Sequence, residues 1–140
     1  MEMKINNRVA VVTGGGSGLG RAMALGLARA GVKVLIAEVR EPEGKKVLKE
    51  IQMLGGAGDL FVGDVSQEKS AERLIHFCIQ RLKGLDILIN NAGLRMEEHD
   101  DGRYEGWRCL KMRPTHELAI DEWDLLLSIN LRAVFLCTHF

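Results

Sequence analysis

The chain has 140 residues, 19 of them basic and 19 acidic, and 46% of its residues are hydrophobic. A chain of this length buries roughly two-thirds of the surface that its unfolded form exposes, so one domain is expected to fold without disulfides or metal. The net charge of zero excludes the excess of basic residues that a nucleic-acid partner requires. The apolar runs are too short to span a bilayer or to form a signal core, so we expect a cytoplasmic protein with no membrane partner.

Short apolar runs alternate with amphipathic stretches over the first 93 residues, a pattern typical of buried parallel strands joined by helices. The runs predict four strands, at residues 9–13, 32–39, 60–62 and 85–89. Three helices are predicted between them: one over 18–30 before Gly31, one from Pro42 to Gly55, and one that Ser66 caps and that ends before Gly84. Right-handed crossovers between such strands build an open, doubly wound parallel sheet with helices on both faces, a three-layer αβα fold.

Residues 94–120 interrupt this pattern, because they are rich in charge and have no clear period. They predict a charged insertion that forms a long surface loop with one short helical turn. We favour a variable surface insertion there, with a lid or a partner contact as the alternative. A fourth helix is predicted from Asp121, and no stop signal follows it before Phe140. We therefore expect a sheet truncated after the fourth strand and the helix that follows it.

Glycine is the most unusual feature of the composition, since five of the 16 glycines lie within residues 14–20. This cluster lies between the first predicted strand and the first helix, where backbone N–H groups and the helix dipole favour an anion. Glycine suits the position because a Cβ would hold a pyrophosphate away from the backbone, and because glycine alone adopts positive φ freely. A glycine-rich turn that only connects strand to helix is the alternative.

The spacing of the cluster decides between nucleotide motifs. The Gly-x-Gly-x-x-Gly pattern fails because Leu19 stands at the third glycine, and the Walker A pattern fails because Arg21 stands at its lysine. What fits is Thr13-Gly14-x-x-x-Gly18-x-Gly20. The predicted cofactor-binding residues of this segment are Thr13, Gly14, Ser17, Gly18, Leu19 and Gly20.

Acidic and amide residues follow the other predicted strands. Glu38 ends the second strand, where a carboxylate accepts hydrogen bonds from an adenosine ribose and repels a 2′-phosphate. We therefore expect NAD as the cofactor, with NADP as the alternative because Arg40 lies close by, and with an ordinary exposed glutamate as the non-functional reading. Asp64-Val65 and Asn90-Asn91-Ala92-Gly93 follow the third and fourth strands, at the sheet edge where open α/β sheets bind ligands.

These residues together resemble the short-chain dehydrogenase/reductase family, in its single-domain branch. The resemblance rests on four motifs: the glycine segment, Asp64-Val65, Asn90-Asn91-Ala92-Gly93, and Asn130 within Ile-Asn-Leu. It implies a Rossmann-type, NAD(P)-binding domain over residues 1–140, in which Asp64 accepts from the adenine amino group and the Val65 backbone reads the ring. It also implies that Asn91, Ala92 and Gly93 approach the adenosine side, and that the full-length protein forms a homo-oligomer through its final helix.

The same resemblance implies an activity, hydride transfer between a nicotinamide and a small alcohol or ketone. Asn130 would support the proton relay, whereas the family's serine and Tyr-x-x-x-Lys are expected beyond residue 140, so residues 1–140 alone are predicted inactive. The single tyrosine, Tyr104, has Arg108 in place of that lysine and is better read as a loop residue. A non-catalytic or degenerate NAD-binding module is the alternative, and a Walker-type phosphate binder is the weakest one.

Cysteine and histidine spacing indicates neither a disulfide framework nor a metal site. The three cysteines, Cys78, Cys109 and Cys137, are odd in number and widely separated, and the four histidines have no ligand spacing.

Overall fold

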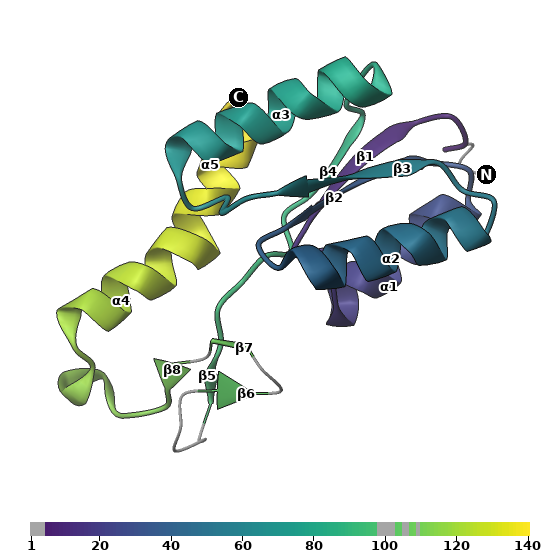
Figure 1. The fold of residues 1–140 in the computed structure, drawn as a ribbon. Coiled ribbons are helices and arrows are strands. Elements are labelled where there is room, and N and C mark those ends of the chain that lie inside the picture. The colour runs from purple at the N-terminus through teal and green to yellow at the C-terminus, as the bar shows by residue number, and fades with distance from the viewer. Residues whose placement is uncertain (1–4, 98–102, 105–106, 109) are drawn as a thin grey trace.

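The computed structural model describes residues 5–97, 103–104, 107–108 and 110–140. Within them, four strands form one parallel sheet in the order β3-β2-β1-β4 (Figure 1). The strands are β1 (Val9–Thr13), β2 (Lys33–Glu38), β3 (Gly58–Val62) and β4 (Ile87–Ile89). The helices between them are α1 (Gly18–Arg29), α2 (Glu41–Met53) and α3 (Glu68–Leu82). The predicted α/β fold with a parallel, doubly wound sheet is confirmed, and the strand bounds differ from the prediction by at most two residues.

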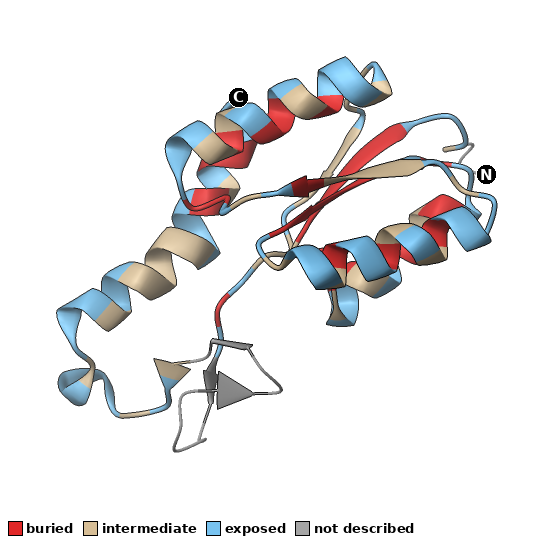
Figure 2. Cartoon of the chain, viewed as in Figure 1, coloured by how far each residue is buried: buried red, intermediate tan, exposed pale blue. Residues whose placement is uncertain are grey.

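Alternating residues of the central strands build two separate cores. Val11 and Leu35 are buried beneath α3 and the final helix, whereas Val12 and Ile36 are buried beneath α1 and α2. Successive side chains of a strand point to opposite faces, so an uninterrupted apolar run supplies both cores. Figure 1 shows the resulting three layers, and Figure 2 shows the buried residues concentrated on the central strands and on the helix faces that cover them.

The sheet register aligns the carboxyl ends of the strands. Thr13 pairs with Ala37, Glu38 pairs with Val62, and Val12 pairs with Ile89. The loops that leave these strand ends therefore share one edge of the sheet. β4 lies at the side of the sheet, where β1 is its only strand partner among the described residues.

The N-terminal end of α3 differs from the prediction, whereas the helix ends before Gly84 as expected. Its N-cap is Gln67, without a side-chain cap bond, so the expected cap by Ser66 is wrong. Ser66 lies one residue before that N-cap, and its hydroxyl donates to Asp64 Oδ1 at 2.7 Å. At the other end Lys83 adopts the left-handed conformation (φ 67°), so the helix turns one residue before Gly84.

Residues 94–120 contain strand pairs that were not predicted. β5 (Met96–Glu97) pairs with β8 (Leu110–Lys111), and β6 (Arg103–Tyr104) pairs with β7 (Trp107–Arg108). Strands of two residues are too short to leave a period in the sequence, which is why a loop was expected. The expected helical turn is present as the 3₁₀ turn η1 (Thr115–Glu117).

The final helix is continuous but has two kinds of turn. α4 (Ile120–Leu127) leads into a π-helical turn, η2 (Ser128–Arg132), and then into α5 (Ala133–His139). α5 buries Ala133, Leu136 and Cys137 in the core beneath α3, whereas α4 buries no side chain and projects beyond the sheet (Figure 1). None of the helices in the described ranges is long and apolar enough to cross a membrane.

Cys78 and Cys137 are free and buried, and Cys109 lies outside the described residues. Burial raises the pKa of each of the two thiols to about 11. At pH 8 such thiols hold about a hundredfold less thiolate than ordinary ones, so we expect alkylation in the native chain to be slower by that factor or more than in the unfolded chain. Peptide-resolved mass spectrometry of iodoacetamide labelling measures this, and equal rates in native and urea-unfolded chains would contradict it.

The same thiols give stability a pH dependence of known sign. The pKa of each thiol is higher in the folded chain than in the unfolded chain. The stability that the protonated thiols contribute is therefore complete below the ordinary thiol pKa, and it is lost as the pH rises towards about 11.

Candidate cofactor-binding site

The glycine loop between β1 and α1 needs glycine for different reasons at different positions. Gly14 and Gly18 have positive φ, +62° and +49°. A Cβ on Gly14 would also lie 2.9 Å from the Cα of Ala92, whereas a Cβ on Gly18 would meet no atom within 4 Å. Gly14 therefore allows the segment after β4 to approach closely, and Gly18 turns the chain beside open space.

Gly20 packs α1 against the loop. A Cβ there would collide with the carbonyl oxygen of Gly14 and would lie 2.5 Å from Nδ2 of Asn91. The sequence predicts Gly20 as a cofactor-binding residue, and the structure adds a role in packing α1 against the loop.

The N-terminus of α1 is suited to an anion. Its N-cap, Ser17, makes no side-chain cap bond, and its first turn holds no acidic residue. The first turns of α2, α3 and α4 all hold acidic residues, which α1 lacks. Its N–H groups and its dipole therefore have no negative side chain of their own helix to satisfy them. Leu19 lies in this turn and is 78% exposed.

Thr13 ties the loop to the segment that follows β4. Its hydroxyl oxygen accepts from the backbone N–H groups of Asn91 and Ala92, both at 3.0 Å, and donates to the carbonyl of Ile89 at 3.3 Å. The Asn91 amide donates back to the carbonyls of Thr13 and Gly14, at 3.0 and 3.2 Å. Four of these hydrogen bonds join the two predicted motifs, and the fifth joins Thr13 to the end of β4.

Glu38 lies under the glycine loop and is only 3% exposed. Its Oε2 accepts from the N–H of Gly16 at 3.0 Å, and its Oε1 accepts from the N–H groups of Val39 and Arg40, at 3.0 and 3.2 Å. The Arg40 guanidinium forms an ion pair with Glu43 at 3.0 Å. Within the part of the chain that is described, the carboxylate is therefore held by backbone N–H groups, between the loop and the end of β2.

The predicted adenine-side residues lie next along the same edge. The N–H of Gly63 donates to the carbonyl of Glu38 at 3.1 Å, which joins the ends of β2 and β3. Asp64 is exposed, with Oδ1 accepting from the N–H and hydroxyl of Ser66 and with Oδ2 accepting nothing from the described residues. Val65 is buried at 6% exposure, beneath this turn.

Asn130 lies in the π-helical turn and bonds to the chain after Gly93. Its Oδ1 accepts from the Leu94 N–H at 2.7 Å, and its Nδ2 donates to the Leu94 carbonyl at 2.9 Å. π-helical turns often occur at functional sites. The Asn130 side chain thus holds the backbone of Leu94 in place after β4. The Ile-Asn-Leu sequence does not reveal this contact.

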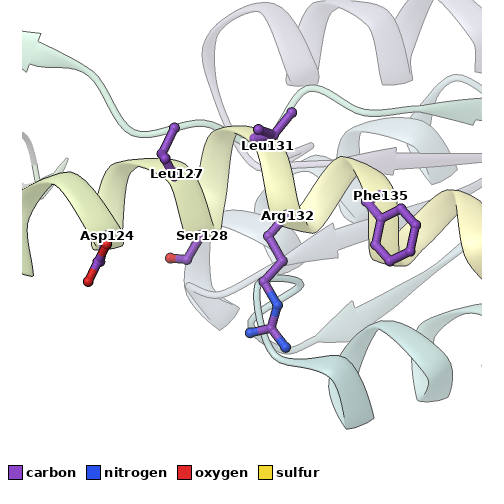
Figure 3. Close-up of a pocket in the computed structure, with 6 residues that line it drawn as sticks. All are labelled: Asp124, Leu127, Ser128, Leu131, Arg132 and Phe135. Carbon is purple, nitrogen blue, oxygen red and sulfur yellow. The ribbon is translucent and has the colours of Figure 1, made fainter.

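A shallow hollow of about 320 Å³ lies elsewhere, on the surface of the final helix (Figure 3). It is lined by Asp124, Leu127, Ser128, Leu131, Arg132 and Phe135. All six belong to one continuous helix, and none is a predicted site residue. The hollow is therefore separate from the glycine loop.

The remaining sequence candidates do not join the site. Arg21, at the Walker lysine position, forms an ion pair with Glu50 of α2. The Ser128 hydroxyl donates to the carbonyl of Leu125 within its own helix. The side chain of Tyr104 lies outside the part of the chain that is described. No cluster of three or more metal-ligating side chains occurs among the described residues.

Sequence reasoning missed two residues of this site. Gly16 was one of the unspecified positions in the glycine motif, although its N–H donates a hydrogen bond to Glu38 Oε2. Leu94 began the charged insertion, although its backbone is the partner of Asn130. The run of three glycines at 14–16 was the available signal for Gly16, and Leu94 had none because its backbone makes the contact.

Comparison with known proteins accounts for this arrangement. The family model described as short chain dehydrogenase matches residues 8–140. A cyclohexanol dehydrogenase of Acinetobacter sp. is 31% identical over the whole chain, which covers 50% of that protein. Short-chain dehydrogenases/reductases of Aspergillus oryzae and Armillaria gallica are each 35% identical, over 97% and 93% of this chain and 47% and 45% of theirs. The chain thus spans about half the length of these curated relatives, and it belongs to the short-chain dehydrogenase family.

Proposed function

We propose that this chain forms the NAD-binding domain of a short-chain dehydrogenase/reductase, with residues 94–120 as an insertion in it. The observation that carries the choice of NAD is the Glu38 carboxylate, held beneath the glycine loop by three backbone N–H groups. A negative charge at that place favours a free ribose hydroxyl and repels a 2′-phosphate.

The residues at the carboxyl edge fit such a cofactor. The first turn of α1 and the space beside Gly18 would receive the pyrophosphate, with Thr13, Gly14, Ser17, Leu19 and Gly20 shaping the loop. Glu38 would bind the adenosine ribose. Asp64 and the backbone of Val65 would bind the adenine, and Asn91, Ala92 and Gly93 would lie along the adenosine side. When bound, the nicotinamide supplies hydride acceptance from an alcohol or hydride donation to a ketone.

Substrate and catalysis are proposed by family membership. A small alcohol or ketone is the proposed substrate, and the Acinetobacter relative is named a cyclohexanol dehydrogenase. Asn130 would support proton transfer by fixing the backbone at Leu94 beside the site. The serine and Tyr-x-x-x-Lys of the reaction are expected beyond residue 140, and a homo-oligomer is expected for the full-length protein.

Calorimetric titration of NAD and NADP against the chain tests the proposal. We expect NAD to bind more tightly, and Glu38→Ala to weaken NAD by about tenfold to a hundredfold, because a hydrogen bond to a charged group contributes about 1.5–3 kcal/mol. Glu72→Ala on α3 removes the same charge away from the site and should leave both affinities unchanged. Equal affinity of the unsubstituted chain for the two cofactors would contradict the choice of NAD, and binding of neither would contradict the proposal itself.

For residues 1–140 alone we propose cofactor binding without turnover, since these residues contain no Tyr-x-x-x-Lys pair. We therefore expect residues 1–140 to show no change in nicotinamide absorbance with any alcohol or ketone. Turnover by this chain would contradict that expectation.

A further inference from the structure

We propose that Gly16 is a positioning residue for Glu38 and that it sets the discrimination between NAD and NADP. This inference rests on the proposed function, because it concerns the same ribose site. It assigns a role to a glycine that the phosphate-binding motif leaves unspecified.

The first observation is how the Glu38 carboxylate is held. Oε1 accepts two backbone hydrogen bonds, from Val39 and Arg40, and Oε2 accepts one, from Gly16. A carboxylate oxygen offers about two acceptor positions, so Oε1 is full and Oε2 has one left. A ribose hydroxyl would therefore donate to Oε2, the oxygen that the Gly16 N–H holds.

The second observation is the space beside Gly16. A Cβ at this position would lie 2.6 Å from Glu38 Oε2 and 2.9 Å from its Cδ and Cγ. Gly16 has no positive φ, so its backbone conformation does not demand glycine. Glycine is needed here because the Glu38 carboxylate occupies the place of its side chain.

The neighbouring glycines show that this contact is specific. A Cβ on Gly15 would approach Ile36 and the Val12 carbonyl, and one on Gly20 would collide with the Gly14 backbone. Only at Gly16, within residues 14–20, is the obstructed atom the end of a flexible acidic side chain. An alanine at Gly16 would therefore be accommodated by moving the carboxylate, and the fold would survive.

The consequence is a change in cofactor choice. A displaced carboxylate loses its bond to the Gly16 N–H and no longer presents Oε2 to the ribose. NAD would lose a charge-assisted hydrogen bond, while NADP would be relieved of repulsion.

Titration of NAD and NADP against the unsubstituted chain, Gly16→Ala, Glu38→Ala and the double variant tests the proposal. We expect Gly16→Ala to weaken NAD about tenfold and to lower the ratio of the NADP to the NAD dissociation constant towards that of Glu38→Ala. The double variant should bind NAD no more weakly than Glu38→Ala, because the added methyl then fills vacated space. Gly26→Ala, an open position on α1, should leave the ratio unchanged.

Three results would overturn the inference while the proposed function stands. The ratio of the NADP to the NAD dissociation constant is unchanged in Gly16→Ala, or the double variant loses NAD affinity by the product of the two single losses. The third is a double variant that circular dichroism shows to be unfolded. An unfolded Gly16→Ala would overturn it as well, because the inference requires the Glu38 carboxylate to move aside in a folded chain. Failure of the unsubstituted chain to bind either cofactor is a different outcome, which overturns the proposed function and this inference with it.

Discussion

Replacing Thr13 with valine is expected to lower the free energy of unfolding by about 3 kcal/mol, the largest effect that we predict. Valine has the same shape as threonine but cannot accept the N–H groups of Asn91 and Ala92. Thr13 is only 2% exposed, so these donors lose their partner at a place that water reaches poorly. Each unpaired buried donor costs about 1–3 kcal/mol.

Urea unfolding followed by circular dichroism measures this effect, and the midpoint of thermal unfolding should fall by about 10 °C. Thr13→Ser is the matched control, because it keeps the hydroxyl oxygen and removes only a methyl group. A valine variant as stable as the serine variant would show that the hydroxyl does not hold the segment after β4.

Replacing Gly20 with alanine is expected to cost about 2 kcal/mol of stability and to abolish cofactor binding. The added Cβ would meet the backbone carbonyl of Gly14, which cannot move without shifting the loop. The turn that Gly14 and Gly18 form would then no longer aim its N–H groups at one point.

Gly26→Ala in the same helix is the control for the intrinsic preference of helices for alanine. Its Cβ would meet no atom within 4 Å, so this substitution should raise stability by up to about 1 kcal/mol. Urea unfolding and NAD titration of both variants make the comparison. Equal stability of the two alanine variants would contradict close packing at Gly20.

The central strands could be predicted from the sequence because they are buried on both faces. The runs at β1 and β2 contain apolar residues that face both cores, such as Val11 and Val12 of β1, and short runs of this kind are typical of buried parallel strands. The strands β5 to β8 could not be predicted, because strands of two residues are too short to show a period in the sequence. The N-cap of α3 was predicted one residue too early, because the observed N-cap, Gln67, is not a residue type that is typical of this position.

The site was predictable in its location and less so in its contacts. The glycine spacing, Glu38 and Asn91 mark the strand ends that the register brings to one edge. The hydrogen-bond partners of Glu38 could not be predicted, because they are backbone N–H groups. Every residue except proline has such a group, so the sequence does not distinguish the partners. The same reason hid the contact between Asn130 and Leu94.

The π-helical turn has a consequence for how the length of the final helix can vary. An α-helix rotates by about 100° with each residue, and a π turn accommodates one residue more than an α turn. Loss of one residue from η2 would therefore rotate α4 against α5 and carry Asn130 away from Leu94, while α5 stayed packed beneath α3. Exposed positions of α4 are free to change their side chains, but the number of residues between Asn130 and the buried Ala133 is fixed by geometry.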